Sequence, residues 1–304
     1  MERGHEIKVL DHGYVRYVDS MGSDEAIVEA ARMSTGRGFT GWDANKECAR
    51  CGLRFTEEQT VSGWKCADGV SDEHDWKKIP GDSKLLAFLY ANKHMTPFEC
   101  GGELMIEVKA PIMVFREWHR HRTQSFNEFS ARYAQMPDEH YLPSLERVQK
   151  QSAANKQGSA EALAPHDAAT FIMKVCRQQK DVYEFYDQAV NAGVAKEIAR
   201  LNTPVSRYSK MRAKTDLRNW LAFLLLRMAP NAQWEIRQYA NAVAEIVKEI
   251  WPRTFTLFEE HDLHGVHLSR AEAAEIRHGL LESHTGWAKS DESAEKILKK
   301  LEGR

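Results

Sequence analysis

Apolar side chains follow two spacings along this chain, which predict strands in some segments and helices in others. Between residues 7 and 18 apolar and polar positions alternate loosely, which indicates an N-terminal strand pair or hairpin. Residues 103–109 alternate more strictly, so their apolar side chains share one face of a further strand. Residues 205–212 are expected to form another strand.

Other segments carry apolar residues at helical spacing. Ser23 is expected to cap the first helix, and Pro111 begins another where its missing amide costs nothing. The expected helices cover residues 24–35, 82–94, 111–121, 167–191, 194–200, 216–228 and 231–251, with two polar helices after residue 269. The second should bury Leu85, Leu86, Phe88 and Leu89. Thr96 and Pro97 are expected in a turn, because a residue before proline is disfavoured in helices. These elements predict an α+β fold.

Composition narrows the class of protein. The chain has 304 residues, 42% of them hydrophobic, and can bury a substantial core as one large domain or one domain with decorations. Its net charge of −2 argues against binding to nucleic acid or membranes by bulk charge. No apolar run approaches the ~18 residues of a membrane span, and MERGHEIKVL lacks an apolar signal core. We therefore expect a soluble, cytoplasmic protein.

Residues 36–41, GRGFTG, match the G-x-G-x-x-G pattern of dinucleotide-binding turns. That pattern binds a pyrophosphate only between a strand and the N-terminus of a helix. Here a helix is expected before the pattern, and no helical spacing follows it. We interpret the segment as a flexible loop.

Residues 42–81 are rich in Cys, Trp, Gly and charged residues. Cys48 and Cys51 form a C-x-x-C pair in a chain with five cysteines, an odd number that suits reduced thiols or a metal better than disulfides. Cys66 and His74 could complete a tetrahedral zinc site with them. The alternative is a loop with free cysteines, since two thiolates alone would hold zinc poorly.

A dense polar segment, RHRTQSFNEFSARY, occupies residues 120–133. It continues from the helix that begins at Pro111, on which Arg116 and Arg120 are expected one turn apart. A solvated face is the usual meaning of such a pattern, but solubility alone is served by lysine. Arginine binds phosphates and carboxylates at two points, so the segment predicts a site for a nucleotide and a cofactor. His94, taken alone, is more typical of a helix cap or dipole partner.

The same segment resembles the signature RHRxxSxNExSxRY of flavin-dependent thymidylate synthases, with every fixed position filled. Further segments similar to that family are AARMSTG, HMTPFE, KAPIMVFREWHRHR, VAKEIAR, KTDLRNWLAFLLLR and AQWEIRQYA. The resemblance covers residues 27–258, with 42–81 as an insertion. It implies a catalytic domain over residues 1–264 and a helical extension over residues 265–304.

The resemblance implies an architecture and a reaction. Helices pack around a mostly antiparallel sheet, and a homotetramer forms active sites from several subunits. The implied reaction methylates dUMP at C5 to give dTMP. Its carbon donor is 5,10-methylenetetrahydrofolate, its redox carrier is FAD, and NADPH reduces the flavin.

The resemblance also assigns residues to these ligands. FAD would contact His94, Thr96, Arg120, His121, Arg122, Glu128, Asp216 and Arg218. dUMP would contact Glu117, Arg120, Glu128, Ser130, Arg132, Arg200 and Arg227. The candidate catalytic residues are Arg227, Ser130 and His94. A cation such as Arg227 at the uracil edge favours loss of the N3 proton. Ser130 is expected to bind rather than attack, because no base is evident beside it.

Three positions depart from the family's pattern. Glu117 stands where glutamine is common, Asp216 replaces an asparagine, and Ala222 stands where a polar flavin contact is often found. The Glu117 carboxylate would repel a phosphate dianion unless an arginine such as Arg116 compensates.

A nucleic-acid-binding protein is the rival interpretation, with the Cys-rich insertion and the arginine-rich segment on phosphates. It predicts an affinity that falls steeply with salt and no bound chromophore, whereas the enzyme binds flavin, dUMP and neither nucleic acid nor membrane. No separate motif indicates the folate or NADPH site.

Overall fold

The computed structural model describes residues 1–43, 45–50, 54–56, 75–79, 81–153, 156 and 158–282. The chain divides into two compact units, Met1–Phe258 and Glu259–Arg304. The first unit contains the signature segment and the central sheet. In the second, a π-helix, η3 (Glu259–Leu263), precedes α10 (Arg270–Glu282). Among the described residues no helix is long and apolar enough to span a membrane.

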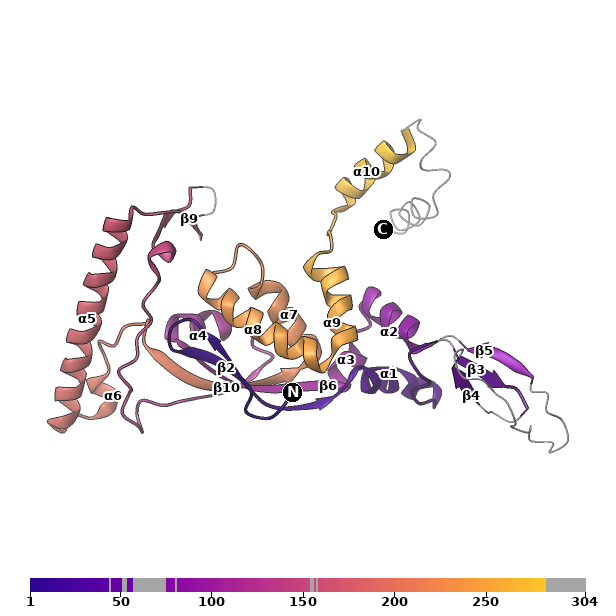
Figure 1. Ribbon diagram of the computed structural model, residues 1–304, viewed down its shortest axis with the longest axis horizontal. Coiled ribbons are helices and arrows are strands. Elements are labelled where there is room, and N and C mark those ends of the chain that lie inside the picture. The colour runs from indigo at the N-terminus through magenta and orange to yellow at the C-terminus, as the bar shows by residue number, and fades with distance from the viewer. Residues whose placement is uncertain are drawn as a thin grey trace. The chain divides into compact units, whose positions relative to one another are not determined.

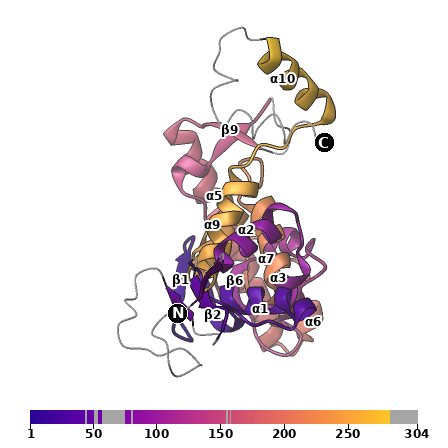
Figure 2. The same cartoon turned by 90° about the vertical axis from the view of Figure 1, so that its right-hand side faces the viewer.

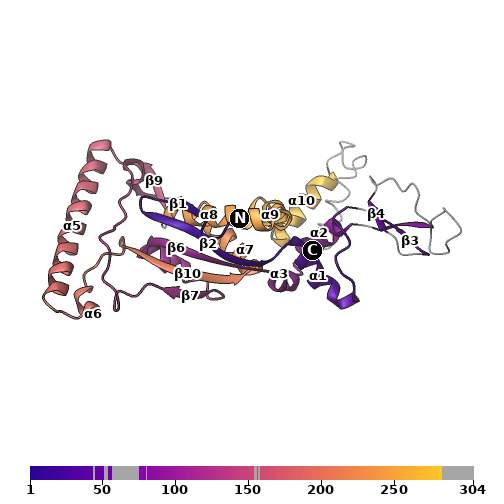
Figure 3. The ribbon, with the colours of Figure 1, turned by 60° about the horizontal axis from the view of Figure 1, so that its bottom comes forward.

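A five-stranded sheet forms the centre of the first unit (Figure 3). Its strands, in spatial order, are β1 (Glu6–Val9), β2 (Gly13–Gly22), β6 (Gly102–Pro111), β10 (Tyr208–Asp216) and β7 (Ser125–Glu128). Every neighbouring pair is antiparallel. Leu104, Ile106 and Val108 of β6 are completely buried, as their alternation predicts. The predicted hairpin and the predicted α+β class are confirmed, while the strand predicted at residues 205–212 lies at Tyr208–Asp216.

Two helices, α7 (Leu217–Arg227) and α8 (Trp234–Ile250), lie over one face of this sheet (Figure 1). Helix α4 (Ile112–Trp118) packs against α8 and β6, and the Trp118 ring lies 4.5 Å from that of Phe223 of α7. Trp118 and Trp220 are fully buried. Burial of such large side chains stabilises the fold by about 1.5–3 kcal/mol each, so this layer holds both α4 and α7 in fixed positions.

A group of short helices packs together near one end of the sheet (Figure 2). It comprises α1 (Asp24–Arg32), η1 (Met33–Thr35), α2 (Asp82–Ala91), α3 (Thr96–Cys100) and α9 (Pro252–Phe258). Ser23 caps α1 as predicted, by accepting a hydrogen bond from the Ala26 amide. The predicted loop that follows Gly36 carries no helix or strand over residues 37–43.

Two expectations for these helices are wrong. Thr96 and Pro97 begin helix α3 instead of a turn, because proline is tolerated in the first turn of a helix. Phe88 is 56% exposed, and its ring packs edge-on against His94 at 5.8 Å rather than into the core. Leu86 and Leu89 are buried as predicted.

The remaining elements surround this core. The long helix α5 (Pro165–Asn191) is followed by α6 (Lys196–Ala199), both within segments predicted to be helical apart from two added residues at the start of α5. The 3-10 helix η2 (Leu145–Arg147) precedes a small hairpin of β8 (Gln149–Gln151) and β9 (Ser159–Ala162). The insertion forms a three-stranded antiparallel sheet of β4 (Arg54–Thr56), β3 (Asn45–Cys48) and β5 (Trp76–Ile79).

Candidate functional site

The end of α7 delivers Arg227 onto the end of α4. Its Nη1 donates to the Glu117 carboxylate at 2.7 Å, its Nη2 donates to the Glu117 carbonyl oxygen at 2.8 Å, and its Nε donates to His121 Nε2 at 2.9 Å. The last carbonyls of a helix lack partners within the helix, so Glu117 can offer its backbone oxygen as well as its side chain. The guanidinium group therefore has a partner at each of its three nitrogens.

The helix that carries Glu117 is shorter than predicted. It ends at Trp118, and the Trp118 indole then donates to the Gln124 side chain at 2.9 Å, so the chain turns back on itself. Arg120 therefore lies in a turn, and the expectation that it stands one helical turn from Arg116 is wrong. The turn allows His121 to point back towards Arg227.

His121 is held as a neutral imidazole. Burial, together with the positive charge of Arg227, lowers the pKa of His121 from its usual 6.5 to about 4, although the Glu117 carboxylate opposes the shift. Its Nε2 accepts a hydrogen bond from Arg227, so the ring proton belongs on Nδ1. The ring also packs edge-on against Phe223 at 4.8 Å. His121 thus positions Arg227 without adding charge.

The charge of Glu117 is compensated, but by a different residue than expected. The sequence suggests Arg116 for this role, whereas the structure pairs Glu117 with Arg227, whose side chain is only 15% exposed. An ion pair shielded from water on one side is stronger than a fully exposed one. The family departure at Glu117 is therefore coupled directly to the main catalytic candidate.

A cavity of about 390 Å³ opens between α4, β7 and the chain that leads into β10. Two residues assigned to dUMP, Glu128 and Arg200, line it together with Arg116. The Glu128 carboxylate is held by the Ser209 hydroxyl at 2.9 Å. Arg200, which was predicted to bind the nucleotide, and Arg116, which was expected to compensate the Glu117 charge, thus line the same cavity.

The second half of the signature is anchored on α5 and α6. Ala131 packs into a buried cluster with Met136, Tyr186 and Ala199. This leaves the Arg132 side chain exposed, where it forms an ion pair with Glu197 at 3.4 Å. Ser130 accepts a hydrogen bond from the Arg132 amide at 3.4 Å.

A larger cavity of about 730 Å³ lies among α1, α2 and α3. His94 and Thr96, both assigned to FAD, line it with Ser34 and with the cationic side chains of Arg37 and Lys84. Its volume is in the range of pockets that bind cofactors. Of the residues described as lining the two cavities, none is shared.

The other assigned residues are dispersed. Asp216 caps α7, where its carboxylate accepts hydrogen bonds from the Asn219 amide at 3.0 Å and the Asn219 side chain at 2.6 Å. Arg218 forms an ion pair with Glu99 of α3. Arg120, Arg122 and Ala222 are exposed. Within one chain the structure gathers part of the predicted site and leaves these side chains at the surface.

The zinc prediction falls mostly outside the described residues. Cys48 is buried in β3, whereas Cys51, Cys66 and His74 lie beyond the part of the chain that is described. Within that part, no group of three His, Cys, Asp or Glu side chains could hold a metal ion.

The sequence interpretation missed Arg207 and Ser209. Ser209 positions Glu128 from the neighbouring strand, and Arg207 lines the smaller cavity. Both lie within the strand predicted at residues 205–212, where no local pattern signals binding. The pairing of β10 with β7 brings Ser209 next to the signature, and Arg207 directly precedes β10.

Comparison with known proteins places this geometry in a family. The sequence profile of the thymidylate synthase complementing protein family matches residues 16–253. The chain belongs to this family. The resemblance to flavin-dependent thymidylate synthases is thereby confirmed: a flavin-dependent thymidylate synthase of Thermus thermophilus is 41% identical over 281 residues, which cover 92% of this chain and 88% of the relative. The enzyme of the same name from Wolbachia pipientis wMel is 39% identical and covers 90% and 82%.

Solved structures agree with the family membership. A UMP/dUMP methylase from Streptomyces cacaoi, crystallised with 5-Br UMP, superposes with a TM-score of 0.65 at 27% identity. The match covers 84% of this chain and 98% of that one. A second structure of that methylase, with 5-Br dUMP, gives a TM-score of 0.62. The antiparallel sheet with its overlying helices is therefore the fold of a nucleotide methylase.

Proposed function

We propose that this protein is a flavin-dependent thymidylate synthase, which methylates dUMP at C5 to give dTMP. The observation that carries the proposal is the meeting of the signature with Arg227. His121 of the signature and Arg227 are more than a hundred positions apart, yet the Arg227 Nε lies 2.9 Å from the His121 Nε2. Relatives with this name match 90% or more of the chain.

The smaller cavity is the proposed dUMP site. Arg200 and Arg116 supply positive charge for the phosphate, and Glu128, fixed by Ser209, can accept a hydrogen bond from the ligand. Charged hydrogen bonds of this kind contribute about 1.5–3 kcal/mol each. Ser130 and Arg132 are proposed to contact dUMP from the far end of the signature.

Arg227 is proposed to act on the uracil ring. A guanidinium group at the N3 edge stabilises the anion that forms when N3 loses its proton, and this raises electron density at C5. Preorganisation by His121 and Glu117 keeps the group oriented before the substrate binds. Ser130 is proposed as a ligand, since its hydroxyl oxygen accepts a hydrogen bond from a backbone amide and no base contacts it among the described interactions.

The larger cavity fits a flavin nucleotide in the chemistry of its lining. His94 and Thr96 offer donors and acceptors, while Arg37 and Lys84 suit a diphosphate. Arg120, Arg122, Asp216 and Arg218 complete the proposed FAD contacts. When bound, FAD would carry reducing equivalents from NADPH to the pyrimidine. NADPH and 5,10-methylenetetrahydrofolate are the proposed co-substrates.

A homotetramer with shared sites is also part of the proposal. The two cavities of one chain are separate, so joining flavin and dUMP calls for residues of another copy. Helices α5 and α6 and the chain after them expose apolar side chains, which a further copy would cover. These are Phe171, Met173, Phe185, Ile198 and Leu201. A cytoplasmic location is proposed on the free thiols of Cys100 and Cys176.

The test is a flavin spectrum followed by turnover. We expect the purified protein to be yellow, or to become so with added FAD, and to convert dUMP to dTMP when NADPH and methylenetetrahydrofolate are present. A colourless protein that takes up no FAD would contradict the proposal. The rival nucleic-acid-binding function predicts instead an affinity for nucleic acid that falls steeply with salt.

A further inference from the structure

Arg207 is a buried cation with unsatisfied donors. The residue is only 6% exposed, and its Nε and Nη1 atoms are buried without a hydrogen-bond partner among the described residues. Leaving a buried charged donor unpaired is costly, and native proteins contain few such groups. Burial also lowers the pKa of Arg207 from its usual range, and the charge of Arg200 adds to this effect, although Tyr186 and Glu128 oppose it. The side chain is thus held at a cost that a bound anion would relieve.

The backbone of Arg207 is fixed on both sides. Its amide donates to the Pro204 carbonyl at 3.1 Å, and its carbonyl accepts from the Ile112 amide at 3.0 Å, which ties it to the start of α4. On the other side it forms a bridge with His140. The backbone that carries the guanidinium group is therefore held in place.

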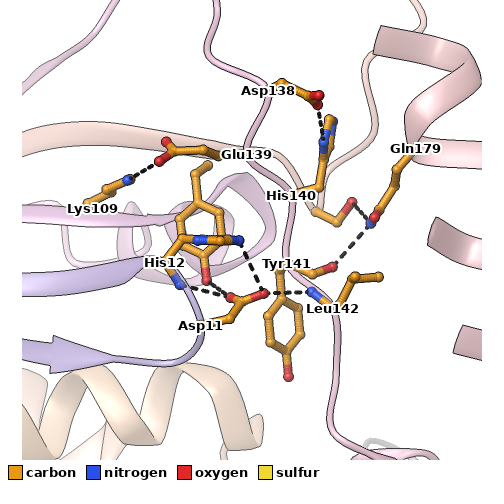
Figure 4. Close-up of polar contacts among 11 residues, drawn as sticks. Asp11, His12, Lys109, Asp138, Glu139, His140, Tyr141, Leu142 and Gln179 are labelled. Carbon is orange, nitrogen blue, oxygen red and sulfur yellow. Dashed lines mark hydrogen bonds and ion pairs between the residues drawn. The ribbon is translucent and has the colours of Figure 1, made fainter.

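The loop that carries His140 is itself held by polar contacts (Figure 4). Asp11 accepts a hydrogen bond from the Leu142 amide at 3.0 Å, and Lys109 pairs with Glu139 at 2.7 Å. Gln179 of α5 donates to the Tyr141 carbonyl at 3.1 Å and to the Ser206 hydroxyl at 3.0 Å. These contacts come from the first hairpin, from β6 and from α5, so the segment around Arg207 is preorganised.

The cavity that Arg207 lines has the charge of an anion site. Three guanidinium groups, those of Arg116, Arg200 and Arg207, face a single carboxylate, that of Glu128. His119 is the remaining titratable group on its wall. Glu128, held by Ser209, keeps its negative charge and offsets only one of the three guanidinium groups, so the cavity lining keeps a net positive charge. A dianionic group would balance the excess positive charge.

We propose that Arg207 binds the phosphate of the nucleotide substrate, from the wall of the cavity that Arg116 and Arg200 also line. The inference rests on the proposed function for the identity of the nucleotide. Arg207 lines the cavity although it is only 6% exposed, so a hydrogen bond from its guanidinium group to phosphate would form in surroundings with little water, where such bonds are stronger than those of the more exposed arginines. It is a substrate-binding residue, and it contributes to recognition of the phosphate rather than of the uracil.

Arg207→Met tests this inference, because methionine is apolar and long enough to fill part of the same space. We expect the affinity for dUMP to fall by about 10- to 100-fold, while the weaker affinity for deoxyuridine, which has no phosphate, is unchanged. Inorganic phosphate should raise the Tm of the wild type and not that of the variant. Without ligand the variant should be at least as stable as the wild type, since an unsatisfied buried charge is lost.

Arg212→Met is the matched control. Arg212 lies on the neighbouring strand β10 but is exposed, with Glu107 3.8 Å away, so its replacement should leave dUMP affinity unchanged. A variant at Arg207 that binds dUMP within about twofold of the wild type would overturn the inference. If Arg207→Met does not fold, Arg207→Gln replaces it with the same expected loss.

Flavin binding separates the two possible sources of phosphate. We expect Arg207→Met to take up FAD like the wild type; a loss of FAD with dUMP affinity intact would overturn the assignment to the substrate. A wild type that bound dUMP but made no dTMP would contradict the proposed function. If Arg207→Met abolished that binding, the phosphate site would still be supported.

Discussion

Arg227 and Arg207 contact opposite ends of α4, and their side chains are in opposite states. Each of the three nitrogens of Arg227 has a partner, from Glu117 or His121. Arg207 is more deeply buried, yet within the part of the chain that the structure describes its Nε and Nη1 have no hydrogen-bond partner. Arg227 is stable without a ligand and has to exchange or share its partners when one binds. Without a ligand, the unpaired buried charge of Arg207 destabilises the folded protein, and a bound anion removes that cost.

The difference suits two separate tasks in the proposed reaction. A group with unsatisfied donors gives binding free energy to any ligand that supplies an anion, so Arg207 and its cavity suit the unreactive phosphate. A group that is already oriented loses little freedom during the reaction, so Arg227 suits the part of the substrate where charge develops. Variants at each residue should therefore change different kinetic quantities.

Arg227→Ala should have the largest effect on turnover. Loss of one preorganised electrostatic group typically lowers kcat by about 10²- to 10³-fold, and we expect that loss in dTMP formation. The flavin absorbance should remain, because the larger cavity is lined by residues from α1, α2 and α3. Turnover near that of the wild type would show that N3 ionisation is assigned to the wrong residue. The proposed difference in role between Arg227 and Arg207 would then fail.

The sequence predicts each side of this comparison to a different extent. The signature and Arg227 are found by resemblance, and α7 is found by its spacing, because both are local patterns. The Arg227–Glu117 contact joins positions that no local pattern connects. The end of α4 is missed because polar residues continue at helical spacing after Trp118, whereas the Trp118–Gln124 hydrogen bond turns the chain. Arg207 is missed because its role depends on which donors stay unpaired after packing.

Glu117→Gln should have a smaller effect, and it should be favourable: dUMP binds more tightly. The amide keeps a hydrogen bond to Arg227 but removes the competing negative charge, so Arg227 is freed more easily for the substrate. Partly exposed ion pairs contribute about 0.2–1 kcal/mol, and we therefore expect dUMP affinity to rise by about two- to fivefold. Titration of the flavin absorbance with dUMP would measure it.

Glu161→Gln is the control for this change, because Glu161 forms a comparable ion pair with Lys150 at 2.9 Å and neither residue is described as lining either cavity. It should not alter dUMP affinity. If Glu117→Gln weakened dUMP binding, the Glu117 carboxylate would favour binding of dUMP. Arg227 would then bind the substrate without breaking its ion pair with Glu117.

The smallest predicted effect is on the pH dependence of stability, through His121. Its pKa of about 4 in the folded protein is below the unfolded value of about 6.5, so the unfolded chain binds more protons between these values. Stability should therefore fall as pH decreases from 6.5 to 4. In His121→Gln, where the amide oxygen can still accept from Arg227, this contribution is absent. Because the ring is only half-buried, we expect its contribution to stability to be about 1 kcal/mol. In a chain of this size that corresponds to a Tm shift of about 2–4 °C. The Tm difference between variant and wild type should change by this amount between pH 6.5 and 4. Parallel Tm curves would mean that the pKa of His121 is the same in the folded and the unfolded chain, so that His121 does not stay neutral beside Arg227 below pH 6.5.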